Sequence, residues 1–167
     1  AAAAAAAEIA SSSSSSSSQN SLSAAVLFEE ELEMVGNAAY TEPSDQSAWW
    51  YHRFLLEFAD TATAAAANSN FEARELYGAC LESEALNLRA LVDMEPGCKW
   101  PLSALNNVLS HLVRHRKESR PEDHDEASDA GGAGDDVSAL EEEWRSTVEA
   151  LKTTDPVRCA YYASLKL

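Results

Sequence analysis

Apolar side chains recur at helical spacing along most of this chain. From about residue 24 to residue 40 they fall on one stripe, while the glutamates between them fall mostly elsewhere. The same spacing predicts helices over about 71–94, after Pro101, and over about 137–152. The predicted core positions are Phe28, Leu32, Val35, Ala39, Tyr77, Leu81, Leu88, Val92, Leu102, Leu105, Leu109, Leu112, Val137, Leu140, Trp144, Val148 and Leu151. The pattern predicts an all-α fold without β-sheet.

Acid-proline pairs mark the turns between these helices. Glu42-Pro43, Glu95-Pro96 and Asp155-Pro156 each follow one predicted helix and precede another that opens with an aromatic residue. Proline disfavours helical geometry in the residue before it, so a helix ends there. We therefore expect antiparallel helical hairpins stacked as an α-solenoid.

Four local signals predict where helices begin. Asp45 can cap a helix that starts beside it, and Pro101 suits the first position of the next one. Ser138 and Glu141 fit a capping box, which places another helix start near Ser138. The Asp155-Pro156 pair is expected to cap a last helix, and this helix is predicted to carry Tyr161, Tyr162 and Leu165.

Low-complexity segments divide the chain. Residues 1–23 are an alanine run, a serine run and a polar tail, a composition that cannot bury enough surface to fold, so we expect disorder. Residues 24–167 are predicted to form one helical-repeat domain. Within it we expect a connecting loop over 61–70, where residues are small or polar, and a solvated acidic insertion over 117–136.

The segment after Pro43 holds the densest cluster of aromatic and cationic side chains. Ala48, Tyr51, Leu55 and Phe58 share one helical stripe, and Trp49, His52, Leu56 and Ala59 share the next. The apolar surface thus covers more than half of the circumference, so this helix needs neighbours on several sides. Arg53 follows Trp49 and Trp50 by one turn, close enough to stack its guanidinium on an indole.

Net charge narrows the range of partners. The chain has 12 Lys and Arg against 28 Asp and Glu, a net charge of −16. Such a charge repels phosphate backbones and anionic lipid surfaces, so neither nucleic acid nor membrane insertion is expected, and no apolar stretch reaches the length of a membrane span. Partners with basic faces, or solubility alone, would explain the acidity.

Cysteine and histidine positions predict no metal site. Cys80, Cys98 and Cys159 are odd in number and widely spaced, which indicates neither disulfides nor a zinc knuckle and favours a reduced, cytoplasmic protein. His111 and His115 are one turn apart, but the residues between them lack the acidic base of a metalloprotease helix. We interpret them as a solvated helix end. No catalytic constellation is found.

One segment carries a family resemblance. The run Asp45-Gln46-Ser47-Ala48-Trp49-Trp50-Tyr51-His52-Arg53-Phe54-Leu55-Leu56 resembles the last strong repeat of the protein prenyltransferase α subunits, whose repeats have a Trp-x-x-Arg core followed by apolar residues. Segments 31–40, 91–100 and 151–158 are similar, in order, to the type II (Rab) geranylgeranyltransferase branch. The resemblance covers about residues 25–167. Because the family has several such repeats, one clear copy indicates the C-terminal part of a longer subunit.

The resemblance implies a function. In this family the α subunit is a crescent of helical hairpins that wraps a β subunit, and the β subunit holds the zinc and the isoprenoid pocket. The α subunit supports transfer of geranylgeranyl from geranylgeranyl diphosphate to C-terminal cysteines of Rab GTPases, which a Rab escort protein delivers. The implied chain is a non-catalytic enzyme subunit with no cofactor of its own.

The resemblance also suggests an interface. Trp49 is expected in the core, and Trp50, Tyr51, His52 and Arg53 at the contact with the β subunit, since Trp, Tyr and Arg are frequent interface anchors. The alternative is that all of these residues are core. For the function, two alternatives remain open: a tetratricopeptide-like scaffold without enzymatic role, and the α subunit shared by farnesyltransferase and the type I enzyme.

Overall fold

The computed structural model describes residues 26–65, 71–119 and 133–167. Within these ranges every regular element is a helix, so the all-α prediction is confirmed. The elements are a helix over residues 26–41, α2 (Gln46–Ala65), α3 (Phe71–Met94), α4 (Lys99–Glu118), α5 (Ala133–Thr154), the 3₁₀-helix η1 (Pro156–Arg158) and α6 (Cys159–Ser164). The low-complexity segment over 1–23 lies outside the described residues.

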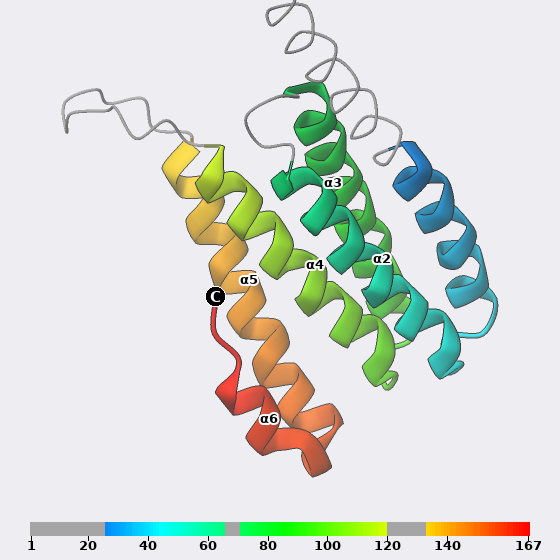
Figure 1. The fold of residues 1–167 in the computed structure, drawn as a ribbon. Coiled ribbons are helices and arrows are strands. Elements are labelled where there is room, and N and C mark those ends of the chain that lie inside the picture. The colour runs from blue at the N-terminus through cyan, green and yellow to red at the C-terminus, as the bar shows by residue number, and fades with distance from the viewer. Residues whose placement is uncertain (1–25, 66–70, 120–132) are drawn as a thin grey trace, which may run out of the picture.

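The long helices lie side by side as hairpins, with the 26–41 helix at one edge and α5 at the other (Figure 1). Helix α4 is central: it contacts α2, α3 and α5. The short α6 packs against α5. Helices α2 and α5 do not contact each other, so α4 is left uncovered between them. The predicted hairpin stacking is therefore confirmed, and it leaves one side of the stack hollow.

One continuous hydrophobic cluster joins the helices. Nearly all of the predicted core positions are buried in it, and only Val92 and Val137 are half-buried. The stripes were predictable because each long helix has an apolar face and a charged face. Helix α2 is the exception, since it is apolar on nearly every side.

The Glu42-Pro43 turn is held to its surroundings by side chains. The Asp45 carboxylate accepts a hydrogen bond from the Ser47 amide at 2.9 Å, which satisfies a free donor in the first turn of α2. The Trp49 indole donates to the Pro43 carbonyl at 2.8 Å, and the Cys98 thiol donates to the same carbonyl at 3.4 Å. The turn before α2 and the turn before α4 therefore pack together at one end of the stack.

The predicted loop over 61–70 is wrong in its first half, because α2 continues to Ala65. Alanine favours helix, and the two threonines satisfy their hydroxyls locally. Thr61 Oγ1 donates to the Glu57 carbonyl at 2.8 Å, and Thr63 Oγ1 donates to the Ala59 carbonyl at 2.9 Å. Residues 66–70 lie outside the described residues.

The acidic insertion predicted over 117–136 is shorter than expected. Helix α4 continues to Glu118, and α5 begins at Ala133, while 120–132 lie outside the described ranges. Ser138 lies inside α5, so the predicted capping box is wrong. Glu141 instead pairs with Lys117 Nζ at 2.7 Å, which ties the end of α4 to α5.

The start of α4 and the C-terminal segment around α6 also differ from their predictions. Pro101 is the third residue of α4 rather than the first, and Leu165 lies just beyond the end of α6. Asp155 is no side-chain cap of η1. Its carboxylate accepts hydrogen bonds from Tyr162 Oη at 3.0 Å and Arg158 Nε at 2.7 Å. The buried acid therefore fastens α6 by its side chain.

Candidate functional site

The first turns of α2 distribute their aromatic residues between the core and the surface. Trp49 is buried, as predicted. Trp50 is 60% exposed and Tyr51 is 40% exposed, so both are available to a partner. Arg53 is exposed as well.

His52 lies in the interior, unlike the other three predicted interface residues. It is 3% exposed, and its Nε2 is 2.9 Å from Glu84 Oε1 on α3. Glu84 is itself buried. A polar pair of this kind satisfies both groups away from water. His52 therefore joins α2 to α3 and, at 3% exposure, offers a partner protein little surface.

Arg53 does not stack on an indole as expected. Among the described residues the cation-π contacts are made by Lys99 and Arg158, on the Trp100 ring at 5.1 and 5.5 Å from its centroid. Arg53 also forms no ion pair or hydrogen bond with any residue that the structure describes. Its guanidinium is left available for an external carboxylate or carbonyl.

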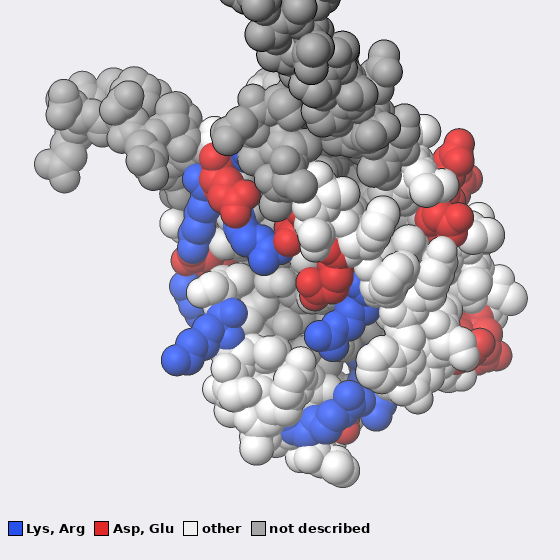
Figure 2. Space-filling view, in the orientation of Figure 1, with Lys and Arg blue, Asp and Glu red and all other residues white. Residues whose placement is uncertain are grey.

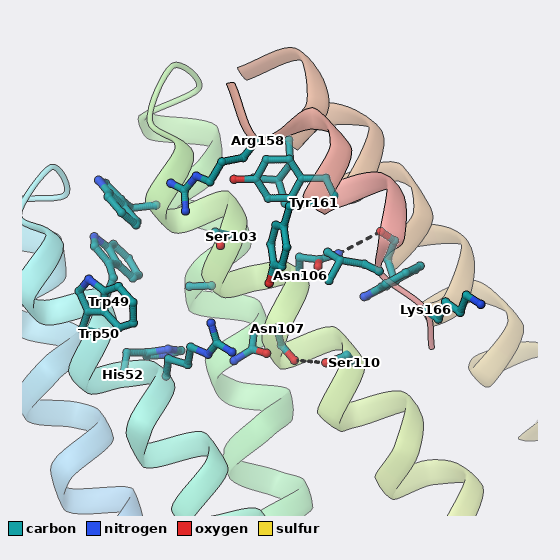
Figure 3. Close-up of a pocket in the computed structure, with 17 residues that line it drawn as sticks. Trp49, Trp50, His52, Ser103, Asn106, Asn107, Ser110, Arg158, Tyr161 and Lys166 are labelled. Carbon is teal, nitrogen blue, oxygen red and sulfur yellow. Dashed lines mark hydrogen bonds between the residues drawn. The ribbon is translucent and has the colours of Figure 1, made fainter. Parts of the chain in front are cut away.

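The uncovered strip of α4 is the floor of a groove of about 420 Å³, which we call the α4 groove. Ser103, Asn107 and Ser110 lie along this floor at helical spacing (Figure 3). Trp50 and Arg53 line it from α2, and Tyr161 lines it from α6. The groove exists because α2 and α5 pack against opposite sides of α4 without meeting.

The charged residues that line the α4 groove are cationic. They are Arg53, Arg158 and Lys166, and the described lining includes no Asp or Glu. In Figure 2 basic side chains gather on the lower half of this face, and acidic ones lie in its middle, in its upper part and along one edge. Burial alone would raise the pKa of Asp155 beneath the groove, but hydrogen bonds from Tyr162 and Arg158 outweigh it and hold this pKa below its usual value. Asp155 therefore stays ionised and fastens the α6 wall.

One buried donor in the groove has no partner among the residues that the structure describes. Asn107 Nδ2 is buried and unpaired within the described structure. The neighbouring Asn106 is satisfied, because its Nδ2 donates to Thr147 Oγ1 at 2.7 Å and to the Trp144 carbonyl at 3.2 Å. An unpaired buried amide is costly, so Asn107 would favour an acceptor supplied from outside.

A row of exposed aromatic rings runs along α2. Tyr51 stacks on Phe54 with ring centroids 6.1 Å apart, and Phe54 stacks on Phe58 at 6.2 Å. Phe58 shares a helical stripe with Leu55 in the sequence, but it is 47% exposed whereas Leu55 is buried. Sequence reasoning missed Phe54, although its spacing from Tyr51 and Phe58 was a usable signal.

The prediction of a solvated histidine pair is wrong for His111, which is 3% exposed. Tyr77 Oη lies 3.2 Å and Arg114 Nη2 2.8 Å from its Nδ1, and Asp60 pairs with Arg114 at 2.7 Å. His115 is half-buried and lies edge-on to the Tyr77 ring. Both histidines therefore serve packing between α3 and α4.

The cysteines occupy three different environments. Cys80 is buried, and burial raises the pKa of its thiol to about 11, while Cys98 is half-buried and Cys159 exposed. In the described part of the chain, no three His, Cys, Asp or Glu residues converge as metal ligands. None of the helices described has the length and apolar character to cross a membrane.

An all-helical stack of hairpins with a Trp-x-x-Arg helix beside a concave groove is consistent with the repeats of prenyltransferase α subunits. The chain is 40% identical over 73 residues to geranylgeranyl transferase type-2 subunit alpha of Dictyostelium discoideum, 44% of this chain and 20% of that protein. It is 26% identical to the protein of that name from Schizosaccharomyces pombe over 145 residues, 86% of this chain and 37% of the relative. The Bos taurus protein of that name is 36% identical over 94 residues, 50% of this chain and 16% of the relative. No family model matches.

The resemblance found in the sequence is therefore confirmed: this chain has homologues across species that are named geranylgeranyl transferase type-2 α subunits. The chain spans only 16% to 37% of the length of these three relatives.

Proposed function

We propose that this chain acts as part of the α subunit of a type II protein geranylgeranyltransferase. In this role it supports a β subunit that transfers geranylgeranyl from geranylgeranyl diphosphate to C-terminal cysteines of Rab GTPases, with a Rab escort protein delivering the substrate. The observation that carries the proposal is the similarity to proteins named type-2 α subunits in amoeba, fission yeast and cattle. The same names favour type II over the farnesyltransferase and type I subunit.

The chemistry of the chain agrees with a supporting role. Prenyl transfer needs a thiolate, which a zinc ion can generate by lowering the thiol pKa. The thiols described here lie on separate elements, and burial raises the pKa of the Cys80 thiol to about 11, which makes its thiolate still less available. They do not fit a zinc site, so we assign the zinc to the β subunit. The free thiols suit a cytoplasmic location.

We propose Trp50, Tyr51 and Arg53 as contacts with the β subunit. The two aromatic residues are exposed, and Arg53 has no partner of its own among the described residues. Exposed Trp, Tyr and Arg side chains are the usual anchors of protein interfaces.

Co-expression with candidate prenyltransferase β subunits, followed by size exclusion and a transfer assay with Rab and its escort protein, tests the proposal. We expect a heterodimer, with neither prenyl transfer nor stoichiometric zinc for the chain alone. Failure to co-elute with any type II β subunit, or one tightly held zinc per isolated chain, would contradict it.

Arg53→Ala tests the interface more sharply. Loss of a buried charge contact commonly costs about 2–5 kcal/mol of association, whereas an exposed arginine without an ion pair contributes little to its own fold. We therefore expect weaker β-subunit binding and an unchanged thermal melt. Arg89→Ala is the matched control, because Arg89 pairs with Glu143 at 2.6 Å between α3 and α5 and should affect the melt instead. A destabilised Arg53→Ala chain that binds normally would refute the assignment.

A further inference from the structure

We propose that the α4 groove binds an acidic segment of a partner polypeptide, through carboxylates that pair with Arg53 and Lys166. The proposal rests on the function above, because it specifies the chemistry of the partner surface that docks on this face. The groove is open along α4 between α2 and α6, so a strand or loop can lie along its floor.

The distribution of ion pairs distinguishes the groove from the rest of the surface. The chain has 28 acidic residues for 12 basic ones, so most cations find a carboxylate of their own. Outside the groove lining, every described Lys and Arg forms an ion pair except Arg74, which hydrogen bonds to Ser119. Within the lining, Arg53 and Lys166 pair with no described residue. Two cations that pair with no carboxylate among the described helices, in a strongly acidic chain, point to carboxylates supplied by a partner.

The remaining positive charge is only partly offset. Arg158 and Lys99 both approach Asp155 Oδ2, at 2.7 and 3.4 Å. One carboxylate therefore serves two cations, and the same two side chains lie over the Trp100 ring. The wall around Trp100 therefore keeps a net positive charge, which adds to that of Arg53 and Lys166 in the groove lining.

The neutral residues of the groove suit a peptide. Asn107 lies on the groove floor, and its Nδ2 is a buried donor without a described partner, so a small turn of the side chain would present it to a carbonyl or carboxylate. Trp50 and Tyr161 are 60% and 49% exposed on opposite walls and can hold one apolar side chain between the acidic ones. A nucleic acid would extend beyond the groove onto a surface with a net charge of −16, which repels phosphate. A short acidic polypeptide segment would contact the α4 groove without reaching the acidic surface around it.

Selection from a phage-displayed library of random dodecapeptides, with the full chain as bait, tests the proposal. We expect enrichment of peptides rich in Asp and Glu around an aromatic or aliphatic residue. The strongest peptide, labelled with fluorescein, should bind about tenfold more weakly to the double variant Arg53→Gln and Lys166→Gln. A variant that keeps the charges, Arg53→Lys with Lys166→Arg, should retain most of the affinity.

The matched control is the double variant Arg145→Gln and Lys152→Gln, which removes two α5 cations that already pair with Glu141 and Glu149. It should change the affinity less than twofold. Circular dichroism checks that every variant is folded. Enrichment of neutral or basic peptides, no enrichment, tighter binding of a single-stranded oligonucleotide, or equal losses in both double variants would overturn the proposal. A chain that assembles with a β subunit but fails this test refutes the groove alone; acidic-peptide binding without assembly refutes the subunit role.

Discussion

At the scale of single residues, His52 shows how burial reassigns a side chain. Its position beside Trp50 and Arg53 in sequence favours an interface role, yet the helical rotation directs it at α3. The pair that it forms with Glu84 is 2.9 Å long and buried on both sides. One residue on, Arg53 is exposed and lines the α4 groove. Of these two adjacent residues, His52 therefore stabilises the fold, and Arg53 belongs to the proposed binding site.

Glu84→Ala should lower the free energy of unfolding by about 2 kcal/mol, because it leaves the buried His52 Nε2 without its partner. Glu82→Ala on the same helix is the control. Glu82 is exposed and pairs with Arg116 at the surface, so its removal should cost less than about 1 kcal/mol. Urea unfolding followed by circular dichroism measures both. Equal effects would show that the buried pair contributes no more than the exposed one.

At the scale of helices, Gly36 and Gly78 have the same low helix propensity, but the space around them differs. A Cβ at Gly78 of α3 would lie 2.5 Å from His115 Nε2, whereas nothing lies within 4 Å of one at Gly36. Gly36→Ala should stabilise the chain by about 0.5–1 kcal/mol through helix propensity. Gly78→Ala should destabilise it by about 1–3 kcal/mol, because α3 and α4 must separate or the imidazole must move. Thermal melts of the two variants should shift in opposite directions.

The buried histidine between α2, α3 and α4 makes stability depend on pH. The pKa of His111 lies below its ordinary value, mainly because the ring is buried. Arg114 also lowers this pKa, whereas Asp60 and Glu57 raise it without cancelling the effect of burial. Below the ordinary value of about 6.5 the unfolded chain therefore binds a proton that the folded chain excludes, and stability falls as pH falls, by at most about 1.4 kcal/mol per pH unit. Tyr77 also faces the ring. The free energy of unfolding should be lower at about pH 5.5 than at about pH 7.5.

His111→Gln is the control for this effect, since it removes the titrating ring. The variant should be less stable at neutral pH but show a flatter pH dependence. His115, whose pKa burial also lowers, would retain part of the slope. An identical slope in both proteins would assign the pH dependence to other groups.

Helix positions and the turns at the acid-proline pairs were predictable from the sequence, but the end of α2 and the start of α5 were not. The stripes through Phe28, Leu81, Leu109 and Trp144 follow from local spacing, which any amphipathic helix must satisfy. The start of α5 depends instead on tertiary contacts, among them the Lys117 and Glu141 pair, which a local capping pattern does not report. On α2 periodicity could not separate core from surface, because apolar residues surround the helix. The groove could not be predicted from the sequence for a different reason: it arises because α2 and α5 do not contact each other, which is a property of the tertiary structure.

At the scale of the whole molecule, the stack is more than a row of independent hairpins. Repeat proteins often contact only their neighbours along the chain, so their parts can unfold separately. Here one hydrophobic cluster extends from the 26–41 helix to Tyr162, and the Arg89 pair with Glu143 bridges α3 directly to α5. Helix α4 lies against three others. The described helices are therefore coupled through α4.

This coupling predicts a single cooperative unfolding transition. Hydrogen exchange measured by mass spectrometry should give similar opening free energies for the central parts of α3, α4 and α5, equal to the value from urea unfolding. Leu109→Ala in α4, where the side chain is fully buried, should lower protection in all three helices by about 2–5 kcal/mol. Leu86→Ala in α3, where the side chain is 66% exposed, is the control and should leave protection nearly unchanged. If Leu109→Ala released α4 alone, or if α5 opened well below the global free energy, the hairpins would be independent units and the groove wall formed by α6 would not be held in place by the core.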